Sequence, residues 1–227
     1  MKFCFRANVY DYDTGNPLMA SVAINGSNGD SWTFTADADG GFELCGDEIK
    51  KRSTYDVDVE LQGFISTGDR FSTVGLSEST TFAREYFLKE VVLDQEYQMP
   101  LVLYAFNEAA LLVDENVNST DSLAYLLDIM ERNETYVIQL ESHTDSRGKD
   151  DYNEELSQRR AQTCVDYLIN AGIERDRLVA VGRGESMLLV SDSEISRMKS
   201  EEEKERAHQA NRRTVFRIMR FDYVPGE

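Results

Sequence analysis

The sequence predicts two domains, an all-β sandwich over residues 1–90 and an α/β sandwich over residues 91–227. Three observations support this fold class. Hydrophobic residues recur with a period of two in the first part and with a helical period in the second, and the change falls near residue 90. A chain of 227 residues also fits a prior of between one and two domains.

Residues 1–90 carry the pattern of short strands separated by turns. In residues 55–61 (YDVDVEL) apolar and acidic side chains alternate, and residues 3–9 alternate in the same way. Turn-forming sequences follow at short intervals in residues 13–17 (DTGNP), 25–30 (NGSNGD) and 37–41 (DADGG). Short strands between such turns, without a helical pattern, predict a small β-sandwich.

The second part alternates between strand and helix patterns. Apolar side chains of residues 123–130 fall at i, i+3, i+4 and i+7, which predicts one face of a helix. A second helical stripe covers residues 156–169 and ends at Gly172, a suitable residue after a helix terminus. Strands are expected at residues 101–106, 136–140, 178–181 and 215–221. The order is βαβαβ plus a last strand, which predicts helices on one face of a mixed sheet.

Two further segments lack a strong apolar pattern. The linker EVVLDQEYQ (residues 90–98) contains no Pro, Gly or Ser, so we expect a short connection between the domains. Residues 191–211 are polar with little apolar pattern, and we expect a solvated helix or an insertion there, not a site.

The charge balance excludes two classes of partner. The chain has 24 basic and 42 acidic residues, and residues 1–96 and 97–227 each carry a formal charge of −9. Nucleic acids and anionic membrane surfaces are therefore poor partners, because their affinity comes mainly from lysine and arginine. The longest apolar runs are far shorter than the ~20 residues of a membrane span. We expect neither a signal peptide after Met1 nor a lipid anchor at Cys4, since no hydrophobic stretch precedes or follows them closely.

The three cysteines do not form a disulfide scaffold. Cys164 falls on the apolar stripe of the second helix and is expected to be a buried small residue. Cys4 and Cys45 lie in separate strand segments, and the sequence leaves open whether they are bridged, because it does not give their distance.

The best candidate site lies in residues 142–161 (SHTDSRGKDDYNEELSQRRA). Asp145 follows a buried strand, Gly148 permits a tight turn, and Asp150 is a reasonable N-cap for the next helix. Arg160 lies one turn beyond Leu156, so its side chain can reach the same cleft. A carboxylate and a guanidinium beside one cleft suit a zwitterionic ligand. The alternative is a salt bridge between Asp145 and Arg160 themselves.

The sequence gives little support for catalysis or metal binding. It has two histidines, His143 and His208, and lacks the CxxC and HExxH spacings of common metal sites. A metal site at His143 and Asp145 would need a third ligand that the sequence does not place. His143 is expected to be a structural hydrogen-bonding residue. We therefore expect no catalytic residue, metal or cofactor.

The motifs SHTDSRG, YNEELSQRRA, YLINAGI, RLVAVGRGES and NRRTVFRI occur in this order over residues 97–223. They resemble the OmpA-like peptidoglycan-binding domain, the family of the OmpA C-terminal domain, the Pal lipoprotein and MotB. The resemblance implies an α/β OmpA-like sandwich that binds the diaminopimelate of the peptidoglycan stem peptide. By position it implies that Asp145 and Arg160 hold this ligand, and that four further residues complete the site: Thr144, Asn153, Leu156 and Arg212.

Residues 1–90 resemble carboxypeptidase-regulatory-like domains through VYDYDTGNPLMASVAI, TADADGGFEL and YDVDVELQGF. This resemblance implies a transthyretin-like sandwich without catalytic machinery. The pair of domains resembles the C-terminal region of PorE-type proteins of type IX secretion. Together they imply non-covalent anchoring of an envelope complex to peptidoglycan in the periplasm, with envelope proteins as partners and possible outer-membrane association. The alternatives are a docking or scaffold module without wall binding and an envelope hydrolase.

Overall fold

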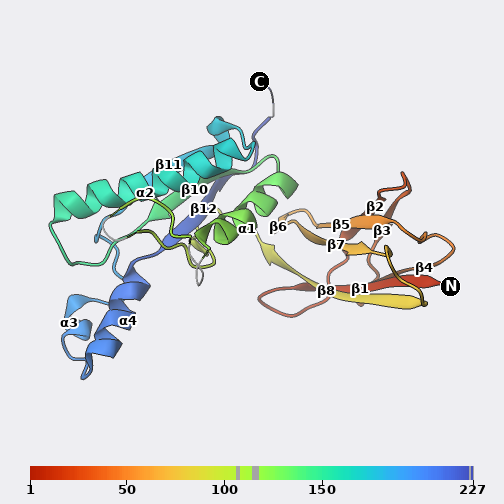
Figure 1. Cartoon of the computed structure of the whole chain (residues 1–227), viewed down its shortest axis with the longest axis horizontal. Coiled ribbons are helices and arrows are strands. Elements are labelled where there is room, and N and C mark those ends of the chain that lie inside the picture. Colours follow the sequence, from red (N-terminus) through yellow and green to blue (C-terminus); the bar gives the residue numbers. More distant parts are fainter. Residues whose placement is uncertain (106–107, 114–117, 225, 227) are drawn as a thin grey trace. The chain divides into compact units, whose positions relative to one another are not determined.

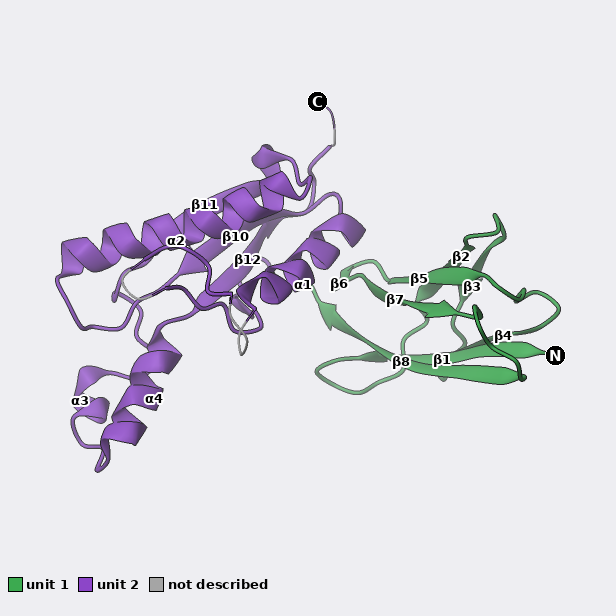
Figure 2. Cartoon of the chain, viewed as in Figure 1, with its two compact units in different colours: residues 1–91 green, residues 92–227 purple. Residues whose placement is uncertain are grey.

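The computed structural model describes residues 1–105, 108–113, 118–224 and 226. The chain forms two compact units, residues 1–91 and residues 92–227 (Figure 2). The first is an all-β region of two sheets, and the second is an α/β region with helices packed on a mixed sheet (Figure 1).

Unit 1 contains two four-stranded sheets with the strand orders β4-β1-β8-β6 and β3-β2-β5-β7. Its strands are β1 (Phe3–Asp11), β2 (Ser21–Gly26), β3 (Ser31–Thr35), β4 (Gly41–Gly46), β5 (Thr54–Glu60), β6 (Phe64–Ile65), β7 (Thr67–Ser72) and β8 (Thr80–Glu90). The alternating apolar and polar residues of the sequence place the apolar side chains on one face of each sheet. In β5, for example, Tyr55, Val57 and Val59 are fully buried.

Aromatic side chains join the two sheets of unit 1. The ring of Phe71 on β7 stacks on Phe5 of β1 with centroids 4.6 Å apart, and on Tyr55 of β5 at 4.9 Å. Phe71 is 3% exposed, so it belongs to the core. Stacked aromatic pairs of this kind add to the stabilisation that burial of their apolar area provides.

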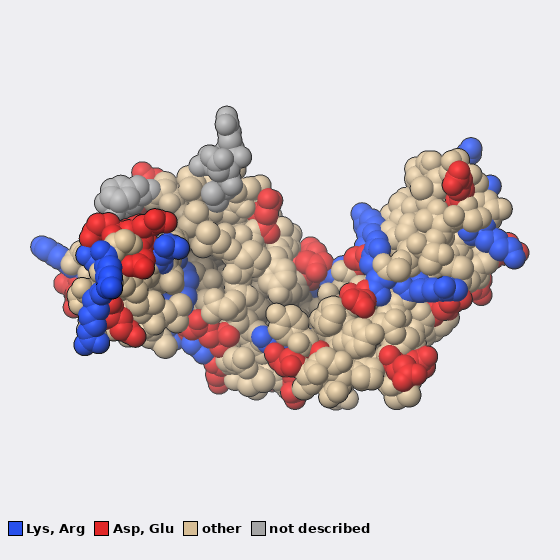
Figure 3. Space-filling view, turned by 90° about the horizontal axis from the view of Figure 1, so that it is seen from below, with Lys and Arg blue, Asp and Glu red and all other residues tan. Residues whose placement is uncertain are grey.

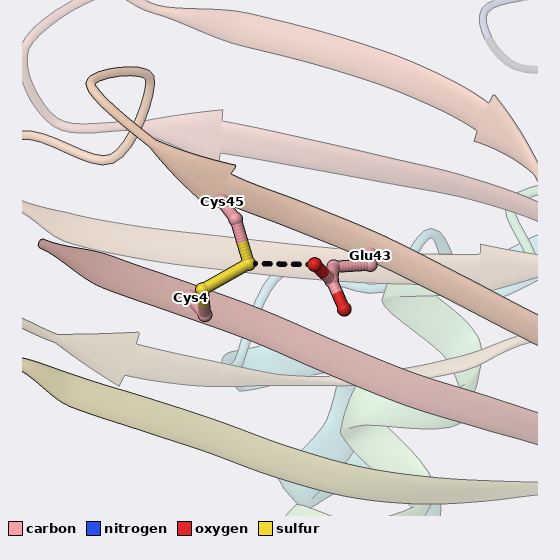
Figure 4. A group of neighbouring side chains, drawn as sticks. All are labelled: Cys4, Glu43 and Cys45. Carbon is pink, nitrogen blue, oxygen red and sulfur yellow. Dashed lines mark hydrogen bonds between the residues drawn. A yellow bond between two sulfur atoms is a disulfide. The ribbon is translucent and has the colours of Figure 1, made fainter.

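A disulfide joins Cys4 and Cys45, which settles the question that the sequence left open (Figure 4). The two residues are direct partners in the antiparallel pairing of β1 and β4, with Cα atoms 4.1 Å apart. The carboxylate of Glu43 lies beside the bridge, with Oε1 3.0 Å from Cys45 Sγ, and also pairs with Arg6. Figure 4 thus shows a covalent cross-link between neighbouring strands with the carboxylate of Glu43 next to it.

Unit 2 contains a four-stranded sheet with the order β11-β10-β12-β9. Strands β10 and β11 are parallel, whereas β12 runs antiparallel to β10 and to β9. Helices α1 and α2 cover one face of this sheet (Figure 1). The elements are β9 (Tyr97–Gln98), α1 (Ser119–Arg132), β10 (Val137–Ser142), α2 (Asp150–Asn170), a 3-10 turn (Arg175–Arg177), β11 (Leu178–Gly182), α3 (Asp192–Ile195), α4 (Glu201–Asn211) and β12 (Thr214–Arg220).

Two local expectations are wrong. Of the strand expected at residues 101–106, the described residues 101–105 form no strand, and residue 106 lies outside the described part. The sheet strand is Tyr97–Gln98, and Pro100, which lacks an N–H, follows it closely. Leu103 bonds instead to Ser119 Oγ, through both its N–H and its carbonyl, at 2.9 Å each. Asp150 is not the N-cap of α2 but its first residue, since Lys149 occupies the cap position.

The polar segment before β12 folds as two helices, α3 and α4. Each begins with a capping box, formed by Ser191 with Glu194 and by Ser200 with Glu203. The helices form a small hairpin that extends away from the sheet of unit 2 (Figure 1). The expectation of a solvated helix is therefore confirmed, although α4 also contributes to the site described below.

Surface properties agree with the sequence. On the face shown in Figure 3, acidic and basic side chains lie interspersed. None of the helices in the described ranges combines the length and apolar character that a membrane crossing needs.

Candidate functional site

Unit 2 contains a cavity of ≈ 720 Å³ between the segment after β9, the loop after β10, the start of α2 and the end of α4. All six residues that the sequence analysis selected line it: Thr144, Asp145, Asn153, Leu156, Arg160 and Arg212. The structure therefore brings the candidate residues together, while their role in ligand binding stays a prediction.

The loop after β10 is held at both sides where it leaves the sheet. The N–H of His143 donates to the carbonyl of Arg213 at 2.8 Å, and that of Thr144 donates to Gly184 at 2.9 Å. Asn153 Nδ2 donates to the carbonyl of Asp145 at 3.2 Å and to Glu185 Oε2 at 2.6 Å. Because Asn153 is 3% exposed, these bonds connect the loop firmly to α2. The loop therefore presents Asp145 at the cavity in a defined position.

The carboxylate of Asp145 is surrounded by guanidinium groups. Its Oδ2 accepts from Arg147 Nη2 at 2.7 Å, from Arg147 Nε at 3.1 Å and from Arg212 Nη1. Its Oδ1 accepts from the backbone N–H of Arg147 at 3.1 Å. Burial alone raises the pKa of Asp145, but the hydrogen bonds from Arg147 and Arg212 outweigh burial and hold this pKa below its ordinary value. Asp145 is therefore an anion at neutral pH.

The same two arginines also bind Glu205 on α4. Arg147 Nη1 lies 2.9 Å from Glu205 Oε2, and Arg212 Nη2 lies 2.7 Å from Glu205 Oε1. Asp145, Arg147, Glu205 and Arg212 thus form a closed charge ring in which each guanidinium bridges both carboxylates. The charge ring is neutral overall.

Arg160 lies in the same cavity without a carboxylate partner among the described residues. Its Cζ is 4.7 Å from the centroid of the Tyr104 ring, and its Nε donates to the carbonyl of Glu108 at 3.0 Å. Arg160 is 8% exposed, and burial lowers its pKa without bringing it near neutrality. The expected alternative, a salt bridge between Asp145 and Arg160, is wrong, because Arg147 and Arg212 occupy Asp145.

A hydrogen-bond network holds Tyr104 under Arg160. The Tyr104 hydroxyl lies 2.8 Å from Thr214 Oγ1 and 3.2 Å from Cys164 Sγ, and Thr214 Oγ1 lies 3.0 Å from Ser142 Oγ. The prediction that Cys164 is buried is confirmed. Burial raises the pKa of the Cys164 thiol to about 11. The thiol is therefore neutral at physiological pH.

His143 differs from its expectation as a hydrogen-bonding residue. Both ring nitrogens are buried and lack a hydrogen-bond partner in the described part of the chain. Burial, with the nearby charge of Arg213 as a smaller cause, lowers the pKa of His143 to about 4. The ring is therefore neutral at physiological pH.

One group of donor atoms, from Glu96, Glu141 and His143, has the spacing of a metal site. Each carboxylate is already engaged by arginines: Arg183 and Arg217 bind Glu141 at 2.5 and 3.2 Å, and Arg213 and Arg217 bind Glu96 at 3.3 and 3.4 Å. Three guanidinium charges against two carboxylates oppose an added cation, so the donor set does not fit a metal.

Several residues that line the cavity were not selected from the sequence, among them Tyr104, Arg147, Glu205 and Gln209. Arg147 lies two residues after Asp145 in the SRG sequence. A basic residue this close to a carboxylate can pair with it in place of Arg160, and this was the available signal. Glu205 and Gln209 lie in the polar segment that was expected not to form a site, but the structure places both in the cavity wall. Their spacing of four residues on α4, which places both on one face of the helix, was the available signal.

Part of unit 2 resembles known proteins in sequence. The sequence model of the OmpA family matches residues 103–202. Outer membrane protein A of Escherichia fergusonii is 44% identical over 85 residues, which cover 37% of this chain and 34% of that protein. The chain spans about a quarter to a third of the length of the curated relatives it matches.

Solved structures also align with this chain, among them the following two. A putative MotB-like protein from Desulfovibrio vulgaris is 28% identical, with a TM-score of 0.41 over 56% of this chain and 72% of that one. The peptidoglycan-associated lipoprotein from Burkholderia pseudomallei is 20% identical, with a TM-score of 0.39 over 52% and 86%. From the sequence matches, residues 103–202 form an OmpA-like domain, and the β unit before it lies outside the matched residues.

Proposed function

We propose that the chain binds peptidoglycan non-covalently, through the diaminopimelate side chain of the stem peptide. The observation that carries this proposal is the buried guanidinium of Arg160, which faces the cavity without a described carboxylate partner. A buried guanidinium in this state favours a ligand carboxylate, which it binds with two parallel hydrogen bonds. The OmpA family match supports the same class of ligand.

The chemistry of the cavity agrees with this ligand. The free end of diaminopimelate carries an ammonium and a carboxylate on one carbon, attached to an aliphatic chain. We assign the carboxylate to Arg160 and the ammonium to Asp145. Leu156 and Val102, which are 4% and 3% exposed, offer apolar walls for the aliphatic part. Thr144, whose buried Oγ1 lacks a described partner, offers a hydroxyl for a further hydrogen bond.

We also propose that the site binds without catalysis, as OmpA-like domains typically do. Catalysis of hydrolysis needs an activated nucleophile or a base with a pKa near neutrality. Burial keeps the Cys164 thiol protonated and keeps His143 neutral and enclosed. These ionisation states support binding over an envelope hydrolase.

In this proposal the protein works in the periplasm and anchors an envelope complex to the cell wall. The matches to outer membrane protein A support an envelope location. Unit 1 acts as a spacer or docking module for envelope partners, and its two four-stranded sheets support a carboxypeptidase-regulatory-like, transthyretin-like sandwich. We extend the proposal to a role in type IX secretion. The support for this role is the resemblance of the domain pair in the sequence.

Co-sedimentation with purified sacculi tests the proposal. Asp145→Asn and Arg160→Met should each lose binding by about 30-fold or more, because each leaves a charged ligand group unpaired in a desolvated site. Arg159→Met and Asp151→Asn are matched controls, since both residues are exposed on α2 and lie outside the cavity wall. If both cavity variants sediment like the wild type, the site assignment is wrong. If the wild type stays in solution, the docking or scaffold function replaces wall binding.

A further inference from the structure

The charge ring covers the carboxylate that the ligand ammonium needs. This inference rests on the proposed function and concerns two residues outside the predicted site. We propose that Arg147 competes with the ligand ammonium for Asp145, and that Glu205 on α4 retains Arg147 when the ligand enters. The Arg147–Glu205 pair would then determine how strongly the site prefers ligands with an ammonium group.

The first argument is the crowding of Asp145. Its Oδ2 already accepts three N–H groups from two guanidinia, and its side chain is 8% exposed. An ammonium that approaches this oxygen meets two positive charges at contact distance, which oppose its binding. One guanidinium therefore has to leave before Asp145 can pair fully with the ligand.

The second argument identifies Arg147 as the group that leaves. Its side chain is 52% exposed, against 25% for Arg212. Arg212 has a further partner, since its Nη2 donates to Gln209 Oε1 at 2.6 Å. It also lies between α4 and β12, where the backbone is anchored at both ends. Arg147 lies in the loop before Gly148. Its guanidinium can leave Asp145 by a movement of the side chain, without a movement of the backbone.

The third argument is that Glu205 remains an ion-pair partner of Arg147 after Arg147 has left Asp145. Glu205 already binds Arg147 at 2.9 Å and is 55% exposed at the rim of the cavity. When the ammonium takes Asp145, Arg147 keeps its contact with Glu205, so no guanidinium loses all of its carboxylate partners. The exchange replaces one cation at Asp145 by another, so the number of cations that contact Asp145 is unchanged.

Glu205 belongs to α4, in the polar segment that the sequence analysis expected to lie outside the site. Glu205 and Gln209 are four residues apart and Arg212 follows three residues later, so one face of α4 meets the cavity. The helix thus contributes a carboxylate that acts on the ligand through Arg147, which makes Glu205 a positioning residue.

Titration calorimetry of the full chain with two peptides tests this inference. One peptide is the stem tripeptide that ends in diaminopimelate. The other carries 2-aminopimelate in the same position, which keeps the terminal carboxylate and lacks the ammonium. The measured quantity is the selectivity ratio, the Kd of the 2-aminopimelate peptide divided by the Kd of the diaminopimelate peptide.

The two rim substitutions should move the selectivity ratio in opposite directions. Arg147→Met, which removes the competing cation, should raise it by ~3- to 10-fold, and Glu205→Gln, which leaves Arg147 with Asp145 alone, should lower it by ~2- to 5-fold. Arg147→Lys and Glu205→Asp keep the charges and should retain ratios near the wild type. Glu202→Gln is the matched control, because this exposed acid on α4 lies outside the cavity wall.

The outcomes separate the inference from the proposed function. If the wild type prefers the diaminopimelate peptide but both rim variants keep its ratio, or shift it in the same direction, the inference is wrong and the proposed function stands. If the wild type binds neither peptide, both are wrong. Opposite shifts with an unchanged control support the competition between Arg147 and the ammonium.

Discussion

Arg160 and Tyr104 form a cation–π pair in the wall of the cavity, with the guanidinium carbon 4.7 Å from the ring centroid. An aromatic face attracts a cation but does not neutralise it. Arg160, which is 8% exposed, therefore keeps a full positive charge in the cavity wall, with only the carbonyl of Glu108 as a hydrogen-bond acceptor among the described residues. Such a pair is preorganised for a ligand carboxylate.

This relationship predicts discrimination between two types of stem peptide. A lysine-type peptide offers an ammonium without the adjacent carboxylate, so Arg160 stays unpaired when it binds. Leaving a buried charged group unsatisfied costs about 1–3 kcal/mol or more, and we expect diaminopimelate-type fragments to bind at least ~10-fold tighter. Amidation of the free carboxylate should weaken binding in the same direction. Equal affinities by calorimetry would show that Arg160 does not contact the carboxylate.

We predict that the two units divide their roles. Residues 92–227 alone should bind sacculi as well as the full chain, because the cavity and all six predicted ligand-binding residues lie in unit 2. Residues 1–91 alone should fold, since they have their own core and disulfide, but should stay in solution. Co-sedimentation of both fragments beside the full chain measures this. Wall binding by the isolated unit 1 would contradict the assignment.

The disulfide should stabilise unit 1. Cys4 and Cys45 are separated by 41 positions, so the bridge restricts a long segment of the unfolded chain. Replacing both by serine should lower the free energy of unfolding of residues 1–91 by about 2–4 kcal/mol. Urea denaturation of the fragment with and without reductant measures this free energy of unfolding. The double variant should show no response to reductant, and an unchanged midpoint on reduction of the wild type would refute the stabilising role.

His143 should make the stability of unit 2 depend on pH. Its pKa is about 4 in the folded state against an ordinary value of 6.5, so between these values the unfolded chain binds more protons. Stability should therefore fall as pH decreases from 6.5 toward 4, by at most about 1.4 kcal/mol per pH unit. Urea denaturation of residues 92–227 between pH 5 and 7 avoids the range in which carboxylates protonate. His143→Gln should flatten the slope, and a variant with the wild-type slope would show that another group causes it.

The sequence by itself determined the order of an all-β region and an α/β region, because local periodicity states which side chains each strand or helix buries. It also selected Asp145 and Arg160, whose positions after a strand and one turn along a helix follow from short-range geometry. The helices over residues 123–130 and 156–169 lie within α1 and α2 for the same reason.

Only the tertiary structure decided which of these groups touch. The bridge between Cys4 and Cys45 depends on the register of β1 and β4, and the contact of Arg147 with Glu205 joins residues 58 positions apart. The partner of Asp145 was decided in the same way, since Arg147 and Arg212 reach it and Arg160 stacks on Tyr104 instead. Contacts of this kind form only when distant parts of the chain come together, and they depend on which of several nearby charges pairs with which. A local sequence pattern carries no information on either point.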